Sequence, residues 1–189
     1  MNLALPLNAE DLCSPYVRVD KCLAVGYSGI YYMTVGKSGK QTFHDMFIGE
    51  YVHSLDEKKR ISLPKAFRSG LGTKVVMTRG LDNCLFIYSR SAWEKVAAKL
   101  QELSFAQADT RGFNRFILSG AAEVEVDGAG RVLIPDHQKE FAGLKKNVVF
   151  AGVSDRVEVW DAQRWNAYKA KIEKDAERMA ETLGSIGAL

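Results

Sequence analysis

Hydrophobic and polar residues alternate in two separated stretches of this chain, and the same succession of elements follows each stretch. Alternation is typical of a strand with one buried face, so it predicts strands over 46–55 and 121–126. A short apolar strand comes next, and a proline then begins a short helix, since proline suits the first helical turn. Two more strands and a longer helix complete each unit. The later elements predicted for the first unit are strands 61–63, 74–79 and 84–88 and helices 64–69 and 91–100. Those predicted for the second unit are strands 132–134, 147–151 and 156–160 and helices 135–141 and 161–183.

Polar residues at the helix starts support these assignments. Ser91 and Glu94 have the spacing of a capping box, in which two side chains bond backbone N–H groups of the first turn. Asp161 is placed to cap the last helix. Between the units, 106–119 is predicted to form a further helix. Its inward side chains are predicted to be Phe113, Phe116 and Ile117.

The chain contains one phrase twice, 71 residues apart. LDEKKRISLPKAF runs from Leu55 to Phe67, VDGAGRVLIPDHQ runs from Val126 to Gln138, and both place Asp, Arg and Pro at matching positions. The similarity extends over about 46–100 and 117–171. Two copies are too few for a solenoid, and neither half could bury its apolar faces alone. We therefore predict a pseudo-twofold pair whose strands combine into one small barrel.

Positive charge is concentrated in the first unit. Residues 46–100 carry ten bases against five acids, a net +5, whereas 101–189 carry twelve bases against fourteen acids, a net −2. Clustered positive charge is typical of a protein with a polyanionic partner, although an ordinary solvated face has the same composition. Because the whole chain has a net charge of only +3, the distribution is more informative than the total.

Composition excludes several classes of protein. With 189 residues, 47% hydrophobic and 26% charged, the chain is typical of a globular protein of one domain or two small ones. It has no apolar run long enough to predict a membrane span, and its acidic start argues against a secretory signal. The three cysteines include no CxxC pair, which favours a reducing cytoplasm over a disulfide framework. Cys84 is predicted to be a small buried hydrophobe.

Catalytic and metal-binding patterns are not recognisable. His44, His53 and His137 are scattered, and none stands at metal-ligand spacing from another His or Cys. We also find no nucleophile–base arrangement. The sequence therefore predicts no catalytic residue, no metal, no cofactor and no small-molecule substrate, and an enzyme is the least supported hypothesis.

The repeated D-x-x-x-R pair points instead to a binding chemistry. Asp suits a tight turn, and Arg60 would project from the base of its loop as a base or phosphate contact. The predicted DNA contacts are Arg60, Lys58, Lys59, Lys65 and Arg131. The residues predicted to shape the loops are Asp56, Asp127, Gly128 and Gly130. The alternative is that each Asp and Arg only pair and stabilise their turn, and the second loop, which has no lysine, favours this alternative for Arg131.

These motifs resemble the MraZ family. The resemblance rests on the MFIGEY strand from Met46, the two D-x-x-x-R pairs, the late DGAGRVLIP and the Trp-containing closing helices, and it covers about 46–175. It implies an α+β fold in which two AbrB-like modules of the swapped-hairpin, double-split-barrel type form an intrachain pseudodimer with peripheral helices. It also implies a bacterial transcriptional regulator of the division and cell-wall gene cluster. Such a regulator forms a ring, binds tandem repeats in promoter double-stranded DNA and represses its own operon.

The resemblance also divides the chain. Two modules are expected at 46–100 and 117–171, a linker helix region at 101–116, and a helix end and tail at 172–189. Residues 1–45 have no counterpart in the family pattern and are expected to be a disordered leader or no part of the native protein. The alternative is a genuine arm, which peptides from 1–45 in mass spectrometry of the native protein would reveal. In the first motif, Lys59 stands where the family usually has Gly, which adds a charge to the turn.

Two functions of different classes follow. The first is a ring-forming, nucleoid-associated regulator in the cytoplasm, in which Trp93 and Trp165 lie in the core or else supply contacts between subunits. The second is an antitoxin-like AbrB relative that holds a partner protein, for which the charged helix 161–183 is available. The basic residues of the first loop favour DNA as the partner.

Overall fold

The computed structural model describes residues 22–26, 29–35, 41–43 and 46–188. The chain divides into two compact units, Met1–His44 and Asp45–Leu189. In the first unit, the described residues form an antiparallel sheet of β1 (Cys22–Gly26), β2 (Gly29–Val35) and β3 (Gln41–Phe43), in the order β1-β2-β3. The expectations about residues 1–21 and His44 lie outside the described residues. All further elements belong to the second unit.

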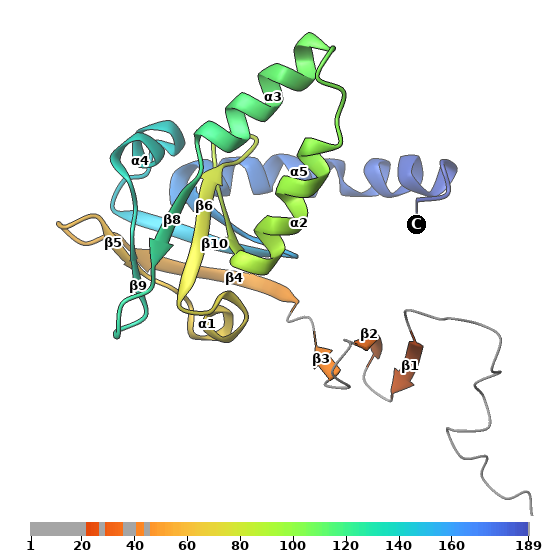
Figure 1. Cartoon of the computed structure of the whole chain (residues 1–189), viewed down its shortest axis with the longest axis horizontal. Coiled ribbons are helices and arrows are strands. Elements are labelled where there is room, and N and C mark those ends of the chain that lie inside the picture. The colour runs from red at the N-terminus through yellow and green to blue at the C-terminus, as the bar shows by residue number, and fades with distance from the viewer. Residues whose placement is uncertain (1–21, 27–28, 36–40, 44–45, 189) are drawn as a thin grey trace, which may run out of the picture. The chain divides into compact units, whose positions relative to one another are not determined.

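The second unit runs through one succession of elements twice (Figure 1). The first repeat consists of β4 (Phe47–Ser54), β5 (Arg60–Ser62), α1 (Lys65–Leu71), β6 (Lys74–Arg79), β7 (Leu85–Ser89) and α2 (Arg90–Gln101). The linking helix α3 (Ala108–Ser119) follows. The second repeat consists of β8 (Ala122–Glu125), β9 (Arg131–Leu133), α4 (Asp136–Ala142), β10 (Asn147–Ser154), β11 (Val157–Asp161) and α5 (Ala162–Ser185). The predicted α+β class and the predicted order of elements are confirmed.

The strands of the two repeats are interleaved in one antiparallel sheet of order β4-β10-β11-β7-β6-β8. The first strand of each repeat therefore pairs with the third strand of the other repeat, β4 with β10 and β8 with β6. If each strand is replaced by its counterpart in the other repeat, the same order results, read from the opposite edge of the sheet. The sheet therefore has a pseudo-twofold axis between β7 and β11. Neither repeat completes the sheet without the other, so the two repeats fold as one body.

The second strands of the two repeats form a separate ribbon, β5–β9. Ile61 pairs with Val132 at its centre, and both side chains are buried. The strands of the two repeats do combine, as predicted, but the hydrogen bonds among the described strands of this unit form a six-stranded sheet and a separate two-stranded ribbon. The physical reason is length: β5 and β9 each have three residues and are followed within two residues by Pro64 or Pro135, which cannot donate to a ladder.

The core is one cluster to which both repeats and the ribbon contribute. Phe67 on α1 packs edge-on against the rings of Phe47 and Tyr51 on β4, with centroids 5.7 and 5.0 Å apart. Phe150, at the middle of β10, is completely buried. Side chains of this size contribute roughly 1.5–3 kcal/mol each when they leave water. The core therefore holds the ribbon against the sheet.

The helix ends follow the local sequence, with two corrections. The short helices begin one residue later than predicted, because Pro64 and Pro135 have extended backbones and take the capping position. The predicted capping box at Ser91 is wrong: β7 ends at Ser89, whose hydroxyl accepts from the backbone N–H of Ala92 at 3.3 Å. The cap at Asp161 is confirmed, since its carboxylate accepts from two backbone N–H groups of α5.

The linking helix α3 reaches the sheet only with its C-terminal part (Figure 1). Ile117 is buried and the ring of Phe116 lies 5.6 Å from that of Phe141, but Phe113 is exposed. The prediction of an inward Phe113 is wrong because this turn of α3 contacts α2 through Asn114, whose side-chain amide donates to the carbonyl of Leu100 at 3.0 Å. The polar neighbour therefore makes the contact, and the phenyl group stays 41% exposed.

Buried polar groups fasten the end of α3. The hydroxyl of Thr78 donates to the carbonyl of Ile117 at 2.6 Å. The amide nitrogen of Gln138 donates to the carbonyls of Met77 and Gly120, both at 2.7 Å. Thr78 and Gln138 are fully buried. Through them the linking helix is tied to β6 of the first repeat and to α4 of the second.

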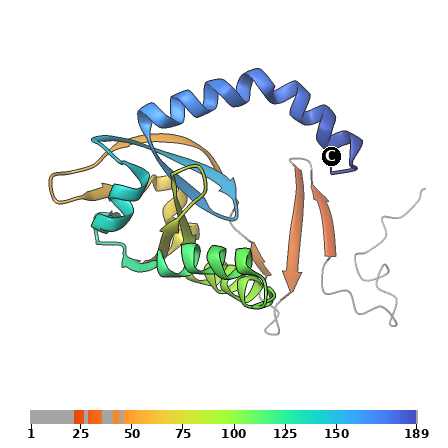
Figure 2. The same ribbon diagram turned by 90° about the horizontal axis from the view of Figure 1, so that it is seen from above.

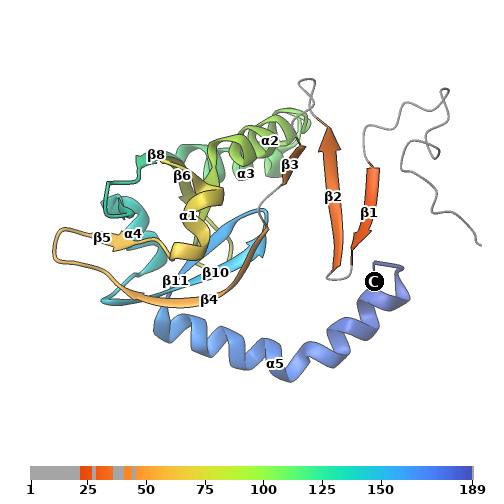
Figure 3. The same ribbon diagram turned by 90° about the horizontal axis from the view of Figure 1, so that it is seen from below.

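The closing helices α2 and α5 lie on opposite sides of the β-structure (Figures 2 and 3). Trp93 on α2 contacts Tyr88, and Trp165 on α5 contacts Trp160, with ring centroids 5.8 and 5.4 Å apart. Both helix tryptophans are half-buried, so each packs on a central strand of the sheet, β7 or β11, and keeps part of its surface outside. Cys84 is a buried free thiol, as predicted.

Candidate nucleic-acid interface

The two repeated loops close with the same hydrogen bonds. The backbone N–H of Asp56 donates to the carbonyl of Arg60 at 2.9 Å, and that of Asp127 donates to the carbonyl of Arg131 at 2.8 Å. In return, the backbone N–H of each arginine donates to Oδ1 of the aspartate, at 2.8 and 2.9 Å. Each aspartate therefore closes its loop twice, once with its backbone and once with its side chain.

The same aspartates hold the arginine side chains. Nε of Arg60 donates to Oδ2 of Asp56 at 2.9 Å, and Nη2 lies 2.9 Å from the same oxygen. For Arg131 and Asp127 both distances are 2.8 Å. A guanidinium has five N–H groups, so each arginine keeps donors beyond those that bind its aspartate. The ion pair fixes the position of the guanidinium and leaves part of it available to another acceptor.

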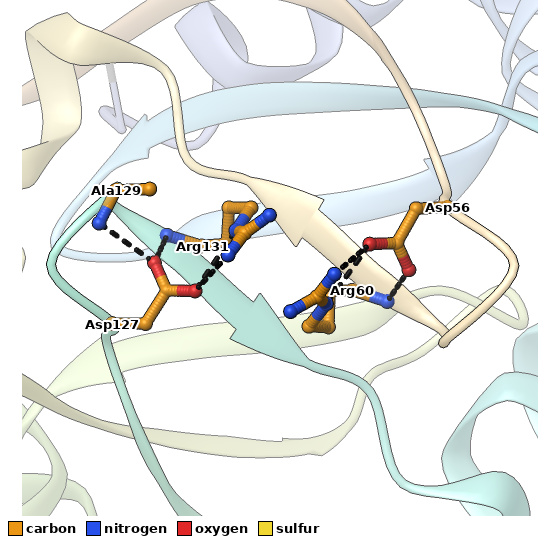
Figure 4. Close-up of polar contacts among 5 residues, drawn as sticks. All are labelled: Asp56, Arg60, Asp127, Ala129 and Arg131. Carbon is orange, nitrogen blue, oxygen red and sulfur yellow. Dashed lines mark hydrogen bonds and ion pairs between the residues drawn. The ribbon is translucent and has the colours of Figure 1, made fainter.

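Both arginines lie on the same face of the ribbon (Figure 4). Neighbouring strand residues point to opposite faces, and Ile61 and Val132 point into the core. The outer face therefore carries Arg60 opposite Leu133 and Arg131 opposite Ser62. The side chains of the two arginines are about one-third exposed, at 32% and 35%. The strand pairing thus brings together two residues that are 71 positions apart in the sequence.

A left-handed residue precedes each arginine. Lys59 has φ +60° and Gly130 has φ +76°, and the N–H of each donates to the carbonyl of the loop aspartate at 3.0 and 2.8 Å. This region is unfavourable for residues with a Cβ. The lysine in the first loop therefore keeps the turn geometry that glycine provides in the second. Gly128 has no positive φ, so of the two predicted glycines only Gly130 is required by the backbone.

Replacing Gly130 with alanine is expected to lower the free energy of unfolding by about 1–2 kcal/mol, the cost of a left-handed residue with a Cβ. The new Cβ would also lie 2.3 Å from Cζ of Arg68, which must move aside. Urea denaturation followed by circular dichroism measures the effect. Gly128→Ala is the matched control, because a Cβ there meets no atom within 4 Å. Equal losses in the two variants would show that the left-handed backbone is not the cause.

Each loop is flanked by the short helix of the other repeat. Lys59 forms an ion pair with Asp136, the first residue of α4, and its carbonyl accepts from the N–H of Ile134 at 2.9 Å. At the other loop, the carbonyl of Gly130 accepts from the N–H of Leu63 at 2.9 Å. These contacts place α4 beside the first loop and α1 beside the second.

The remaining predicted contacts are spread over both loops. Lys58 is exposed in the first loop, whereas Lys65 is exposed at the start of α1, three residues after Ser62, which pairs with Arg131. The structure therefore brings Lys58, Lys59 and Arg60 together and separates Lys65 from them. The sequence analysis did not identify Arg68 and Asp136 as neighbours of the loops. Each contacts the loop of the other repeat, and the sequence of a single repeat does not indicate such a contact.

The ion pairs lower the pKa of the loop carboxyls. The backbone N–H of Arg60, followed by its guanidinium, lowers the pKa of Asp56. For Asp127 the guanidinium of Arg131 is the larger cause and its backbone N–H the smaller. The hydrogen bond from Lys59 and its positive charge lower the pKa of Asp136. All three groups are therefore carboxylates at neutral pH.

These shifts predict an acid-sensitive contribution to stability. Because the folded pKa values lie below the ordinary 3.8, the contribution is present above that value and is lost as the pH falls through the folded pKa. We expect the double variant Asp56→Asn, Asp127→Asn to be less stable than the wild type at pH 7. The difference should shrink below about pH 4. Urea denaturation at a series of pH values measures it, and a difference that does not change with pH would contradict the assignment.

Other binding chemistries have no support in the described ranges. Among residues 46–188 and the described strands before them, no group of three or more His, Cys, Asp and Glu could hold a metal ion. In the same part of the chain, no helix has the length and apolar character needed to cross a membrane.

Comparison with known proteins agrees with the repeat and the motifs. The family described as "MraZ protein, putative antitoxin-like" matches residues 46–116 and 117–184. A protein named Transcriptional regulator MraZ from Acetivibrio thermocellus is 51% identical over 142 residues, which cover 75% of this chain and 99% of the relative. Proteins of the same name from Desulforamulus reducens and Syntrophomonas wolfei are 47% and 45% identical over 138 and 142 residues, covering 73% and 75% of this chain and 97% and 99% of the relatives.

The fold, the ribbon and these matches define a two-repeat α+β protein whose relatives are named transcriptional regulators. The matches extend over nearly the whole length of each relative, and the family covers both repeats. The chain belongs to the MraZ family.

Proposed function

We propose that this MraZ-family protein is a non-enzymatic, sequence-specific DNA-binding regulator of transcription whose β5–β9 ribbon enters a groove of double-stranded DNA. The observation that carries the proposal is the pair of arginines on one outer face of the ribbon, each held by an aspartate. The major groove admits a two-stranded ribbon, and arginine donates two hydrogen bonds to a guanine edge. A guanidinium that is already held in place loses less conformational freedom on binding.

Each residue of the face has a distinct role in this proposal. Arg60 contacts a base or a key phosphate, and Arg131 is its pseudo-symmetric partner. Lys58, Lys59 and Lys65 contact phosphates, which position the protein without specifying sequence. Asp56 and Asp127 orient the arginines. The ion pairs also support the alternative that the arginines only stabilise their turns, so loss of the arginines must be separated from loss of stability.

The strand exchange supports the more detailed fold assignment. A first strand that pairs with the third strand of the other repeat is what a swapped-hairpin pair of AbrB-like modules requires. We propose module limits of 46–100 and 117–171, with 101–116 as linker and 172–189 as helix end and tail. In this view the chain is a pseudodimer that carries both halves of the double-split barrel in one polypeptide.

A ring on tandem promoter repeats follows from the limits of one ribbon. A single ribbon offers only a few positive charges, and each phosphate contact weakens as salt rises. Several ribbons held in one assembly gain affinity through effective concentration. From the family resemblance we propose that the ring binds repeats in the promoter of its own division and cell-wall operon, in the nucleoid of the cytoplasm, and represses it.

Fluorescence anisotropy tests the proposal with the full chain. The probe is a labelled duplex from the DNA upstream of the protein's own coding sequence, compared with a shuffled duplex over a range of salt concentrations. We expect the wild type to prefer the native duplex and Arg60→Ala to reduce that preference roughly tenfold or more, as a lost base contact would. Arg178→Ala is the control, because Arg178 is exposed and belongs to the C-terminal half of α5, which extends away from the ribbon (Figure 1).

A protein-interaction function is the second candidate. Its support is the antitoxin-like description of the family and three exposed apolar residues along the edge strand β4: Met46, immediately before the strand, and Ile48 and Val52 within it, which are 60%, 65% and 68% exposed. Soluble proteins rarely leave such strips without a use. If Arg60→Ala and the wild type bind both duplexes equally, the ribbon is a structural turn and this candidate takes first place.

A further inference from the structure

The net positive charge of the β5–β9 ribbon lies at a different end from the one that the sequence indicates. We infer that the dominant phosphate-binding end of the ribbon is the one that carries Arg131, because the antiparallel pairing of β5 with β9 brings the basic helix α1 to that end. This inference rests on the proposed function. We call the loop of Arg60 together with α4 the Arg60 end, and the loop of Arg131 together with α1 the Arg131 end.

At the Arg60 end, an acid from the second repeat faces the lysines of the first. Asp136, at the start of α4, forms an ion pair with Lys59, and this contact lowers the pKa of the Asp136 carboxyl. A shallow hollow beside this pair is lined by two bases and two acids. A phosphate that approaches Lys59 must therefore compete with a carboxylate that is already bound.

At the Arg131 end, bases from the first repeat face a loop with one acid. The guanidinium of Arg68 lies against Gly130, so close that a Cβ on that glycine would come within 2.3 Å of Cζ. Nε of Arg68 donates to the carbonyl of Leu63 at 2.9 Å, which holds the side chain there. The loop acid, Asp127, is already bound to Arg131. Added positive charge at this end is therefore not cancelled by a second carboxylate in the loop.

The charges of the two ends reverse the ranking read from the sequence. Helix α1 has two bases and no acid, whereas α4 has one base and two acids. The first loop has three bases and two acids from Asp56 to Arg60, and the second has one of each from Asp127 to Arg131. When each loop is combined with the helix that follows it in the sequence, the net charge is +3 in the first repeat and −1 in the second. When each loop is combined with the helix that lies beside it in space, the net charge is zero at the Arg60 end and +2 at the Arg131 end.

Lys65 is the residue through which the Arg131 end would act most directly. It occupies the position in α1 that Asp136 occupies in α4, since the two are 71 residues apart. Asp136 reaches the loop beside it, as its ion pair with Lys59 shows; the pseudo-twofold relation puts Lys65 at the same place beside Gly130. Lys65 is exposed and has no ion pair within the described residues. A DNA phosphate at this place meets a lysine where the other end presents a carboxylate.

Three charge reversals of equal size test the inference in the full chain: Lys65→Glu, Lys58→Glu and Lys171→Glu. Each lowers the net charge by two, so the three variants differ only in where the charge is changed. Lys65 belongs to the Arg131 end, Lys58 to the Arg60 end, and Lys171 is exposed on α5. Affinity for the native upstream duplex is measured by fluorescence anisotropy across a salt series, and circular dichroism verifies that each variant is folded.

We expect Lys65→Glu to weaken binding about tenfold or more and to reduce the salt slope by about 1, the value for one lost phosphate contact. Lys58→Glu should weaken binding roughly threefold, and Lys171→Glu should match the wild type. Asp136→Lys, which gives the Arg60 end the residue of its counterpart, should strengthen binding and steepen the salt slope. This gain cannot be produced by misfolding.

Three results would overturn the inference. They are a larger loss for Lys58→Glu than for Lys65→Glu, equal affinities for Lys65→Glu and Lys171→Glu, and no gain for Asp136→Lys. Each of them leaves DNA binding by the wild type intact and so leaves the proposed function standing. A wild type that binds neither the native nor the shuffled duplex overturns the proposed function itself.

Discussion

Replacing Phe150 with alanine is expected to lower the free energy of unfolding by about 3–5 kcal/mol, the cost of removing a buried phenyl group and leaving a cavity. Phe150 has no exposed surface and lies at the middle of β10, and the ring of His53 packs edge-on against it at 5.6 Å. Because β10 pairs with β4 on one side and β11 on the other, the cavity would open where the two repeats are joined. Urea denaturation followed by circular dichroism measures the loss.

Phe105→Ala is the control for this prediction. Phe105 is 81% exposed between α2 and α3, so its loss should change the free energy of unfolding by no more than about 0.5 kcal/mol. A second informative measurement is the cooperativity of unfolding. If the Phe150→Ala variant unfolds in two separate transitions, the repeats are more independent than their interleaved strands indicate.

Replacing Gln138 with methionine, which has a similar size, is expected to cost about 2–3 kcal/mol. Its amide donates to the carbonyls of Met77 and Gly120, and a buried carbonyl left without its donor costs about 1–3 kcal/mol. The substitution also removes the side-chain oxygen, which is buried without a hydrogen-bond partner among the described residues, and this relief offsets part of the loss. Urea denaturation measures the net effect.

Hydrogen exchange distinguishes this mechanism from a general loss of packing. If Gln138 fastens the end of α3, amide protection should fall at 117–120 more than in β10 or β11. Gln101→Met, at the exposed end of α2, is the control and should leave both stability and exchange unchanged. Uniform loss of protection across the sheet would contradict a local fastening role.

The local elements of this fold were predictable from the sequence because their causes are local. Alternating hydrophobic residues, the prolines that end β5 and β9, and the cap at Asp161 each act within a few positions. The duplication was also legible, since the same phrase occurs at two places 71 residues apart. The cap of α2 was predicted wrongly because two residues suit it. Both Ser89 and Ser91 could cap the helix, and the end of β7 at Ser89 decides between them.

The candidate site was predictable in part. The D-x-x-x-R spacing identified the loops, and it was sufficient to expect that aspartate and arginine act together. It could not show that Arg60 and Arg131 lie on one face, because that depends on the pairing of β5 with β9. Phe67 and Gln138 occupy matching positions in the two copies, yet one packs against aromatic rings and the other fastens α3, since only the second copy lies beside the linking helix.

The order of elements, the repeat, the loop motifs and the family resemblance can all be read from the amino-acid sequence, because each of these depends on residues close together in the chain. The tertiary structure alone decided which repeat supplies the neighbours of each loop. Strands β5 and β9 pair antiparallel across the repeats, so α4 faces Lys59 and α1 faces Gly130. The basic residues of the first loop and those of α1 are close in the sequence but lie at opposite ends of the ribbon. Strand pairing depends on hydrogen bonding and core packing and not on proximity in the sequence.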